Sequence, residues 1–156
     1  MAALRDDFTF ERVWWHAGNP DLSKVGAPNI NGGLHLGTLS QALMRRRPDD
    51  DLHAFRVHIP SGRKRWGFMR DLDGHWRKRC DAHRYRGKLA MVYLNRIEGC
   101  FHHGGGARPS HDWMKAATDT EFRKEFPEAS WSIIALCPDI LEPIDASEKM
   151  QLYRAA

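Results

Sequence analysis

The chain has 156 residues, 42% of them apolar, which is enough to bury a core and most simply forms one domain, residues 1–156. The 24 Lys and Arg exceed the 20 Asp and Glu by four, and this modestly basic balance suits an anionic ligand. Nothing approaches the roughly 18 consecutive apolar residues of a membrane-spanning helix, and residues 1–7 lack the apolar stretch of a signal peptide. The cysteines, Cys80, Cys100 and Cys137, form no C-x-x-C pair, so we expect a protein of the reducing cytoplasm. Because no membrane-spanning run is present, we also expect no membrane partner.

Two short apolar runs each carry one histidine and break at a glycine. The first run, residues 13–18, carries His16 after two tryptophans, and the second, residues 32–38, carries His35 between two leucines. On a strand the two leucines face one side and His35 faces the other. A polar ring that points away from the buried face beside a glycine predicts a ligand cleft, and the alternative is an ordinary surface or core histidine.

The first half of the chain combines short strands with one helix. Thr38 and Gln41 form a capping box at the start of the predicted helix, and the basic residues 45–47 stand at its C-terminal end. Pro48 then ends it. Alternating apolar residues between turn residues predict three strands, over residues 13–16, 34–36 and 52–59.

The second half of the chain continues this mixture. Residues 89–95 are an almost continuous apolar run and form the clearest buried strand. Because strands and helices are interspersed without a repeated βαβ unit, the order favours the α+β class. The other predicted elements are a strand around 66–68, a helix over 71–82, a polar helical stretch over 110–126, a last strand over 131–137, and an irregular tail with a short helix near its end.

Basic residues concentrate between Arg63 and Arg86, where they alternate with aromatic residues such as Trp66, Trp76 and Tyr85. Such a mixture can bind phosphate groups and stack on bases. The alternative is a solvated helix face whose aromatic residues belong to the core. The pattern leaves both interpretations open.

Taken in order, several segments resemble the ADP-ribosyltransferase fold, in the branch with histidine in the first motif that includes diphtheria toxin and the poly-ADP-ribose polymerases. The resemblance is closest to the small ADP-ribosyltransferase domains of phage and bacterial polyvalent proteins. Residues 15–18 resemble the first-strand motif, and residues 21–26 running into 33–42 resemble the second strand and its helix. Residues 85–99 resemble the late strand, and residues 133–140 resemble the strand that usually follows.

This resemblance implies an architecture of split antiparallel β-sheets with inserted helices. It also implies an enzyme that cleaves the nicotinamide–ribose bond of NAD and transfers ADP-ribose to a macromolecular acceptor, a protein or a nucleic acid. A phage or bacterial effector or toxin, acting as a monomer without a metal, is the expected setting.

The resemblance assigns four residues to NAD binding. Main-chain groups of Ala17 and Gly18 would hold the nicotinamide amide, and His16 would hydrogen-bond the adenine-side ribose. Thr38, at a helix start, would contribute its hydroxyl or its main-chain donor.

Two further residues are assigned to catalysis. His35 would pack against the nicotinamide where many relatives have tyrosine, offering less stacking area and a charge at low pH. Glu98 would bind the nicotinamide-ribose hydroxyl, stabilise the developing positive charge and orient the acceptor. Glu128 is the alternative acid, because better-known relatives place this residue just before the final strand.

Residues 99–127 separate the two candidate acids by more chain than is common in the phage-type relatives. We expect this insertion at the mouth of the site, where family members recognise their targets. Trp113, with residues 111–112, would then contact the acceptor, and the alternative is a tryptophan packed on a short helix.

Three other functions stay open. RNA 2′-phosphotransferases share the fold, use NAD and have two motif histidines, so the arginines of residues 63–86 would hold a 2′-phosphate and Glu98 would be dispensable. A fold that has lost turnover would be an inactive binding module. A metal site is the weakest alternative, because its four candidate ligands lack paired spacing: Cys100, His102, His103 and His111.

Overall fold

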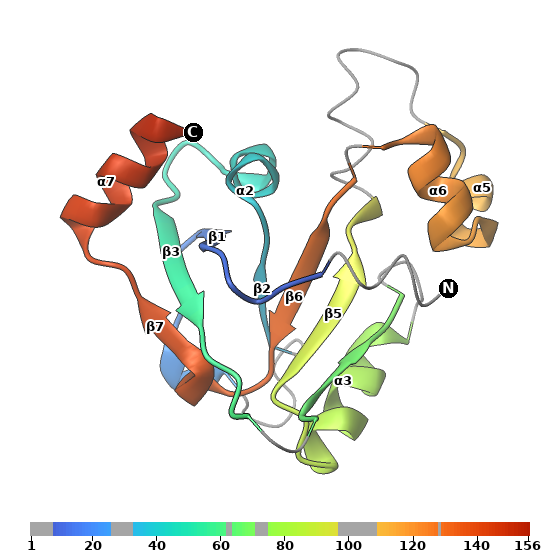
Figure 1. Cartoon of the computed structure of the whole chain (residues 1–156), viewed down its shortest axis with the longest axis horizontal. Helices are drawn as coiled ribbons and strands as arrows, with labels where there is room; N and C mark the ends of the chain where they lie inside the picture. Colours follow the sequence, from blue (N-terminus) through green and yellow to red (C-terminus); the bar gives the residue numbers. More distant parts are fainter. Residues whose placement is uncertain (1–7, 26–32, 62–63, 71–74, 97–108, 128) are drawn as a thin grey trace.

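The chain pairs its strands into two separate sheets (Figure 1). The computed structural model describes residues 8–25, 33–61, 64–70, 75–96, 109–127 and 129–156. The three-stranded sheet is antiparallel and has the order β1 (Trp14–Ala17), β3 (Leu52–Val57), β7 (Leu141–Pro143). The four-stranded sheet has the order β2 (Leu34–Leu36), β6 (Trp131–Ala135), β5 (Ala90–Leu94), β4 (Trp66–Phe68).

The predicted α+β class is confirmed, with one correction to the sheets. β4 and β5 run parallel, so the four-stranded sheet is mixed and not wholly antiparallel. A parallel pair needs a crossover connection, and residues between β4 and β5 supply it with a helix. Within the described residues the chain forms five α-helices: α2 (Leu39–Arg45), α3 (Trp76–Tyr85), α5 (His111–Ala116), α6 (Asp119–Glu125) and α7 (Ala146–Ala155).

The main core lies between the two sheets. Trp14 and Phe55 of the three-stranded sheet meet Leu36, Val92 and Ile133 of the four-stranded sheet, and each of these side chains is at most 2% exposed. Burying such a side chain contributes about 1.5–3 kcal/mol, so this interface dominates the stability of the fold.

Helices cover the two outer faces (Figure 1). On the three-stranded sheet, Ala42 of α2 and Leu152 of α7 pack against Trp15. On the four-stranded sheet, Cys80 of α3 packs against Met91 and Ile134. α5 and α6 instead close one end of the core between the sheets with apolar side chains that include Met114 and Phe122.

The two sheets are joined where their edge strands β1 and β2 meet. Trp15 and Gly37 exchange two main-chain hydrogen bonds there, of 2.8 and 2.9 Å. A Cβ at position 37 would lie 2.3 Å from Gln41 Oε1, so glycine here lets the Gln41 side chain keep its place. We call this junction the seam, and it brings the two histidine-bearing strands side by side.

Most predicted elements lie within one or two residues of their expected ends, and β2 and the capping box of Thr38 and Gln41 are confirmed. Three predictions need correction. The helix expected over 71–82 begins at Trp76, as far as the described residues go, and runs to Tyr85. The stretch 110–126 breaks into two helices at Thr118, which caps the second. In the tail, the predicted helix near the end is confirmed as the ten-residue α7, but the chain before it is not irregular, because β7 forms there.

Two short 3-10 helices, η1 (Leu22–Lys24) and η2 (Pro138–Ile140), complete the described structure. Among the described helices, none combines the length and the apolar composition needed to cross a bilayer.

Candidate functional site

A small cavity lies at the seam between β1, β2 and the start of α2. Its volume is about 110 Å³, below the roughly 300–1,000 Å³ of pockets that enclose a drug-sized ligand. It therefore suits one ring or one end of a larger molecule. The cavity is lined by Trp15, His16, Ala17, His35, Leu36, Gly37, Gln41, Ala42, Arg45, Tyr93, Asn95 and Ser132.

His16 is fixed by the neighbouring edge strand. Its Nδ1 lies 2.8 Å from the carbonyl oxygen of His35, and since a carbonyl only accepts, Nδ1–H donates this bond. Burial lowers the pKa of His16 below its usual value, and nearby His53 and Arg45 lower it further. The ring is consequently neutral near pH 7, which makes Nε2 a hydrogen-bond acceptor.

His35 occupies an aromatic environment. Its Nδ1 lies 3.1 Å from the Tyr93 hydroxyl, and its ring stands edge-on to Trp76 with the centroids 4.8 Å apart. Burial lowers the pKa of His35 to about 4, and Arg45 and His16 reinforce this shift. His35 is therefore an uncharged, largely immobilised ring at neutral pH, and the charge considered from the sequence arises only in acid.

A buried polar network lies behind the histidines. Gln41 Oε1 accepts from the Thr38 amide and from the Ser132 hydroxyl, both at 2.9 Å. Asn95 Nδ2 donates to the same Ser132 hydroxyl at 3.0 Å. Gln41, Ser132 and Asn95 are each at most 4% exposed, so these hydrogen bonds hold the cavity wall in one arrangement.

The electrostatic character of the cavity is positive. Arg45, exposed at the end of α2, is the charged residue of the lining, and it lowers the pKa of both His16 and His35. Among the lining residues that the structure describes, there is no carboxylate. The surface beside the exposed Arg45 therefore favours an anionic group of a ligand, whereas His16 and His35 are neutral in the cavity itself.

The predicted site residues are partly brought together. His16, Ala17 and His35 line the same cavity. Gly18 is adjacent, but its amide donates to the Asp51 carbonyl at 2.9 Å and is thus engaged within the fold. Thr38 is absent from the described cavity lining, and its hydroxyl and amide are both engaged by Gln41.

Both candidate acids, Glu98 and Glu128, lie outside the described residues. The same holds for Cys100, His102 and His103 of the alternative metal site. In the part of the chain that the structure describes, no three His, Cys, Asp or Glu side chains gather as metal ligands.

Comparison with known proteins adds no assignment. No protein family, curated protein or solved structure matches this chain. The site is interpreted from its own geometry.

Sequence reasoning missed much of the cavity wall, namely Gln41, Tyr93, Asn95 and Ser132. The polar residues were visible as interruptions of apolar strands, since Asn95 ends the run 89–95 and Ser132 follows Trp131. Their meeting depends on the pairing of β5 with β6, where Tyr93 lies opposite Ser132.

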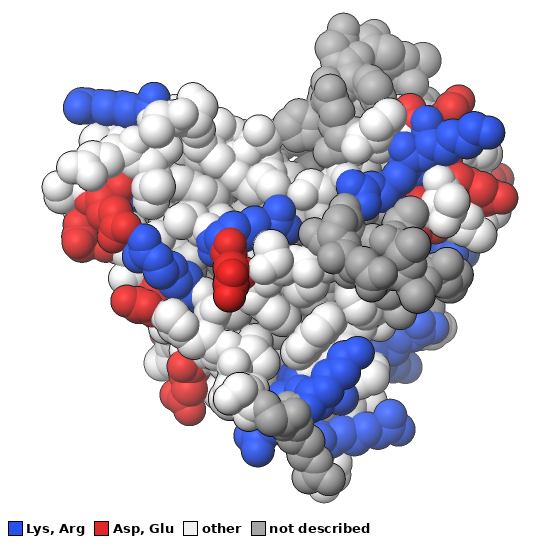
Figure 2. Space-filling view, viewed as in Figure 1, with Lys and Arg blue, Asp and Glu red and all other residues white. Residues whose placement is uncertain are grey.

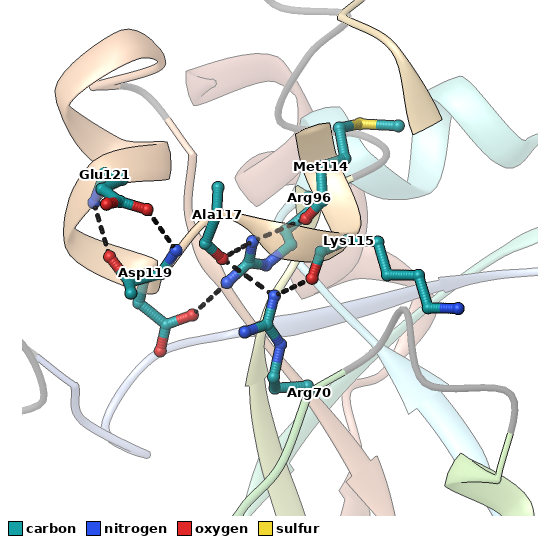
Figure 3. Close-up of polar contacts among 8 residues, drawn as sticks. Arg70, Arg96, Met114, Lys115, Ala117, Asp119 and Glu121 are labelled. Atoms are coloured by element: carbon teal, nitrogen blue, oxygen red, sulfur yellow. Dashed lines mark hydrogen bonds and ion pairs between the residues drawn. The ribbon is translucent and has the colours of Figure 1, made fainter. Parts of the chain in front are cut away.

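Beyond the cavity, Arg96 anchors α5 and α6 to the end of β5 (Figure 3). Its guanidinium donates to the carbonyls of Met114 and Ala117, at 2.8 and 2.7 Å, and pairs with Asp119 at 2.7 Å. Arg70 donates to the Ala117 carbonyl as well, at 2.8 Å. The residue that immediately precedes the segment containing Glu98 is thus held rigidly, only 1% exposed.

Trp113 packs within this same unit. Its ring centroid lies 5.8 Å from that of Phe122 and 6.2 Å from that of Phe126. The packed tryptophan considered from the sequence is therefore the arrangement that the described residues support.

Proposed function

We propose that this chain is an NAD-dependent ADP-ribosyltransferase, in which the cavity at the seam receives the nicotinamide–ribose end of NAD. One observation carries the proposal: His16 and His35, on the edge strands of two different sheets, line one small cavity, and His16 Nδ1–H donates to the main-chain carbonyl of His35. The division of the strands between two sheets agrees with the architecture that the sequence resemblance implies.

The described residues fit NAD as a substrate in three respects. The cavity volume of about 110 Å³ suits a single ring better than a whole dinucleotide. Neutral His16 presents Nε2 as an acceptor for a ribose hydroxyl, and neutral His35 adds an uncharged aromatic wall beside Trp76. Arg45 supplies the positive charge that a pyrophosphate outside the cavity would meet.

In the proposed reaction the bond between ribose C1 and the nicotinamide nitrogen breaks. Its electron pair neutralises the pyridinium ring, which leaves as nicotinamide. The ribose carbon develops oxocarbenium character, bonds to a nucleophilic atom of the acceptor, and the acceptor loses one proton. A carboxylate near the ribose stabilises the developing positive charge.

Glu98 is the proposed carboxylate. It follows the cavity residue Asn95 by three positions, and Glu128 precedes Ser130 by two. Asn95 N donates to the Ser130 carbonyl at 3.0 Å, so a described residue within three positions of each candidate takes part in the same hydrogen bond. Position in the chain therefore makes Glu128 the matched comparison for Glu98.

The test follows labelled NAD incubated with the protein and a bacterial extract. We expect nicotinamide release and label on a macromolecule, and we expect Glu98→Gln to lower the transfer rate by about 100-fold with the protein folded. Glu128→Gln should retain activity. Loss of activity in Glu128→Gln alone would move the role to that residue. Failure of the folded wild type to bind NAD in calorimetry would leave an inactive binding module.

A second candidate is an RNA 2′-phosphotransferase. It is favoured by the two arginines, Arg45 and Arg77, whose charges reach His35 and would suit a phosphate. This reading predicts that Glu98→Gln keeps activity on 2′-phosphorylated RNA and that ADP-ribose 1″,2″-cyclic phosphate is released.

A further inference from the structure

The strongest charge feature outside the cavity is the exposed side of α3. Residues 75–90 contain six Lys and Arg and one Asp, a net charge of +5, whereas the rest of the chain has 18 basic and 19 acidic residues. The positive charge of the protein is thus concentrated in one-tenth of its sequence. Figure 2 shows Lys and Arg side chains gathered at the lower right, where α3 lies in Figure 1, with no acidic side chain among them in that view.

Part of the basic charge of α3 lies on the face opposite its packing face. Trp76 and Cys80 turn towards the sheet, whereas Lys78 and Arg86 are exposed. Two further cations adjoin the C-terminal end of α3. Arg65 and Lys88 stand just before β4 and β5, whose parallel pairing starts at Trp66 and Ala90, and Lys88 Nζ donates to the Lys64 carbonyl at 3.1 Å. We call Arg65, Lys78, Tyr85, Arg86 and Lys88 the basic face.

A half-buried histidine of α3, His83, lies close to these charges. Burial lowers the pKa of His83, and the charges of Arg86, Lys88 and Arg79 lower it further. Arg84 is paired with Asp81 at 2.8 Å, whereas Arg79, Arg86 and Lys88 lie close enough together for their charges to act on the same histidine.

Tyr85 distinguishes this face from a merely solvated helix. It is 96% exposed, far more than any other large apolar or aromatic side chain recorded as exposed among the described residues. Lys78 and Tyr85 are seven positions apart, two turns of the helix, so they share one side, and Arg86 follows directly. An exposed aromatic ring amid cations is the combination with which proteins stack unpaired bases and contact the phosphates between them.

The N-terminal end of α3 lies beside the candidate active site. Trp76, the first residue of α3, contacts His35 edge-on at 4.8 Å, and the charge of Arg77 reaches the same histidine. A polymer lying along α3 would therefore run to the cavity at one end.

We infer that the basic face binds the sugar-phosphate backbone of a single-stranded nucleic acid, and that this strand is the acceptor of the ADP-ribosyl group. The second part rests on the proposed function. In the transfer, an oxygen or nitrogen of the strand bonds to ribose C1 and gives up a proton, while the C1–nicotinamide bond breaks and nicotinamide leaves with its electron pair.

Binding is tested first, without NAD, by fluorescence anisotropy of a labelled mixed-sequence DNA strand of about 12 nucleotides between about 50 and 200 mM salt. The triple variant Arg65→Gln, Lys78→Gln, Arg86→Gln should bind about tenfold more weakly and lower the slope of log K against log salt by about 2. Tyr85→Ala should weaken binding at least about fivefold with the salt slope unchanged.

The matched control is the triple variant Arg47→Gln, Lys124→Gln, Arg154→Gln, which removes the same charge from exposed positions on other helices and loops. It should bind within about twofold of the wild type. Equal weakening in both triple variants would overturn the inference, because net charge alone would then account for binding. Equal competition by poly-glutamate or by duplex DNA, or an unaffected Tyr85→Ala, would also overturn it.

Transfer is tested second, with labelled NAD and the same strand. We expect label on the strand with the wild type and little with the basic-face triple variant. The wild type and this variant should release nicotinamide from NAD in water at similar rates. Nicotinamide release with label only on protein would overturn the acceptor assignment and leave the proposed function standing. Absence of nicotinamide release in a protein that still binds the strand would overturn the proposed function and the acceptor assignment together, and would leave the binding face.

Discussion

At the scale of single residues, His35 shows how a titratable group is kept neutral. Its ring is enclosed by Trp76 and Tyr93, and the positive charges of Arg45 and Arg77 disfavour a proton on it. Under the proposed function, a neutral imidazole in this place would pack against the nicotinamide ring of NAD without repelling its positive charge.

The lowered pKa of His35 has a consequence for stability. In the unfolded chain this histidine takes up a proton near pH 6.5, whereas in the folded protein its pKa is about 4. Between these values only the unfolded state is protonated, so the free energy of unfolding rises with pH and falls as the solution is acidified. The full loss below pH 4 is at most about 3 kcal/mol for this group.

We therefore expect His35→Gln, which keeps a polar partner for Tyr93, to lose less stability than the wild type between pH 6.5 and pH 4.5. The measurement is the urea unfolding free energy at several pH values. The variant will still be destabilised in acid, because the pKa values of His16 and His83 are also lowered. Parallel pH curves for the two proteins would contradict a neutral His35 in the folded state.

At the scale of elements, two helices begin with the same capping box in different surroundings. In α2, Thr38 and Gln41 bond each other reciprocally, as Thr118 and Glu121 do in α6. Gln41 is 4% exposed and also bonds Ser132 and the Ser130 carbonyl, whereas Glu121 is exposed. Gln41 of the first box is therefore part of the cavity wall, whereas the described hydrogen bonds of the second box stay at the start of its own helix.

This difference predicts unequal costs for equivalent substitutions. Gln41→Ala leaves the buried Ser132 hydroxyl and Thr38 amide without their acceptor and should lower the unfolding free energy by about 3 kcal/mol. Glu121→Ala removes one exposed partner of a cap and should cost at most about 1 kcal/mol. Urea titration of both variants measures the difference. Similar losses of unfolding free energy in the two variants would show that the buried hydrogen bonds of Gln41 add no stability beyond capping the helix.

Elements with strong local signals were predictable from the sequence, and those made by long-range pairing were not. β2 is marked by its Leu-His-Leu alternation and α2 by its capping box. β7 is only three residues long, ends in proline and exists because it pairs with β3 about 86 positions earlier in the chain. α3 begins without a side-chain cap at His75, so no capping residue in the sequence indicates where the helix starts.

The candidate site was likewise predictable only in part. The meeting of His16 and His35 in one cavity was predicted, because each histidine stands out from an apolar strand beside a glycine. The remainder of the wall depends on register, since it forms only when Tyr93 and Ser132 are paired across β5 and β6 and Gln41 reaches them from α2. A single sequence records the residues but not that register.

At the scale of the whole molecule, two arginine contacts connect parts that are distant in the sequence. Arg96 joins β5 to α5 and α6 and is 1% exposed, with three acceptors around one guanidinium. Arg56 joins β3 to α7 through an ion pair with Glu148, and the two side chains of that pair are 41% and 38% exposed. Water screens the second contact and is excluded from the first.

Substitution of each arginine by leucine should separate these two situations. Arg96→Leu leaves Asp119 and the Met114 carbonyl without their donor and should lower the unfolding free energy by about 3–5 kcal/mol. Arg56→Leu should lower the unfolding free energy much less, because water screens its ion pair with Glu148. Hydrogen exchange adds a local readout that also applies if Arg96→Leu is only marginally folded, because the amides of α5 and α6 should exchange faster while those of β1 and β3 stay protected. Arg96→Lys, which keeps the charge and loses the fork of donors, should fall between the wild type and Arg96→Leu. Uniform loss of protection throughout the molecule would mean that Arg96 supports the whole fold and not the attachment of these two helices.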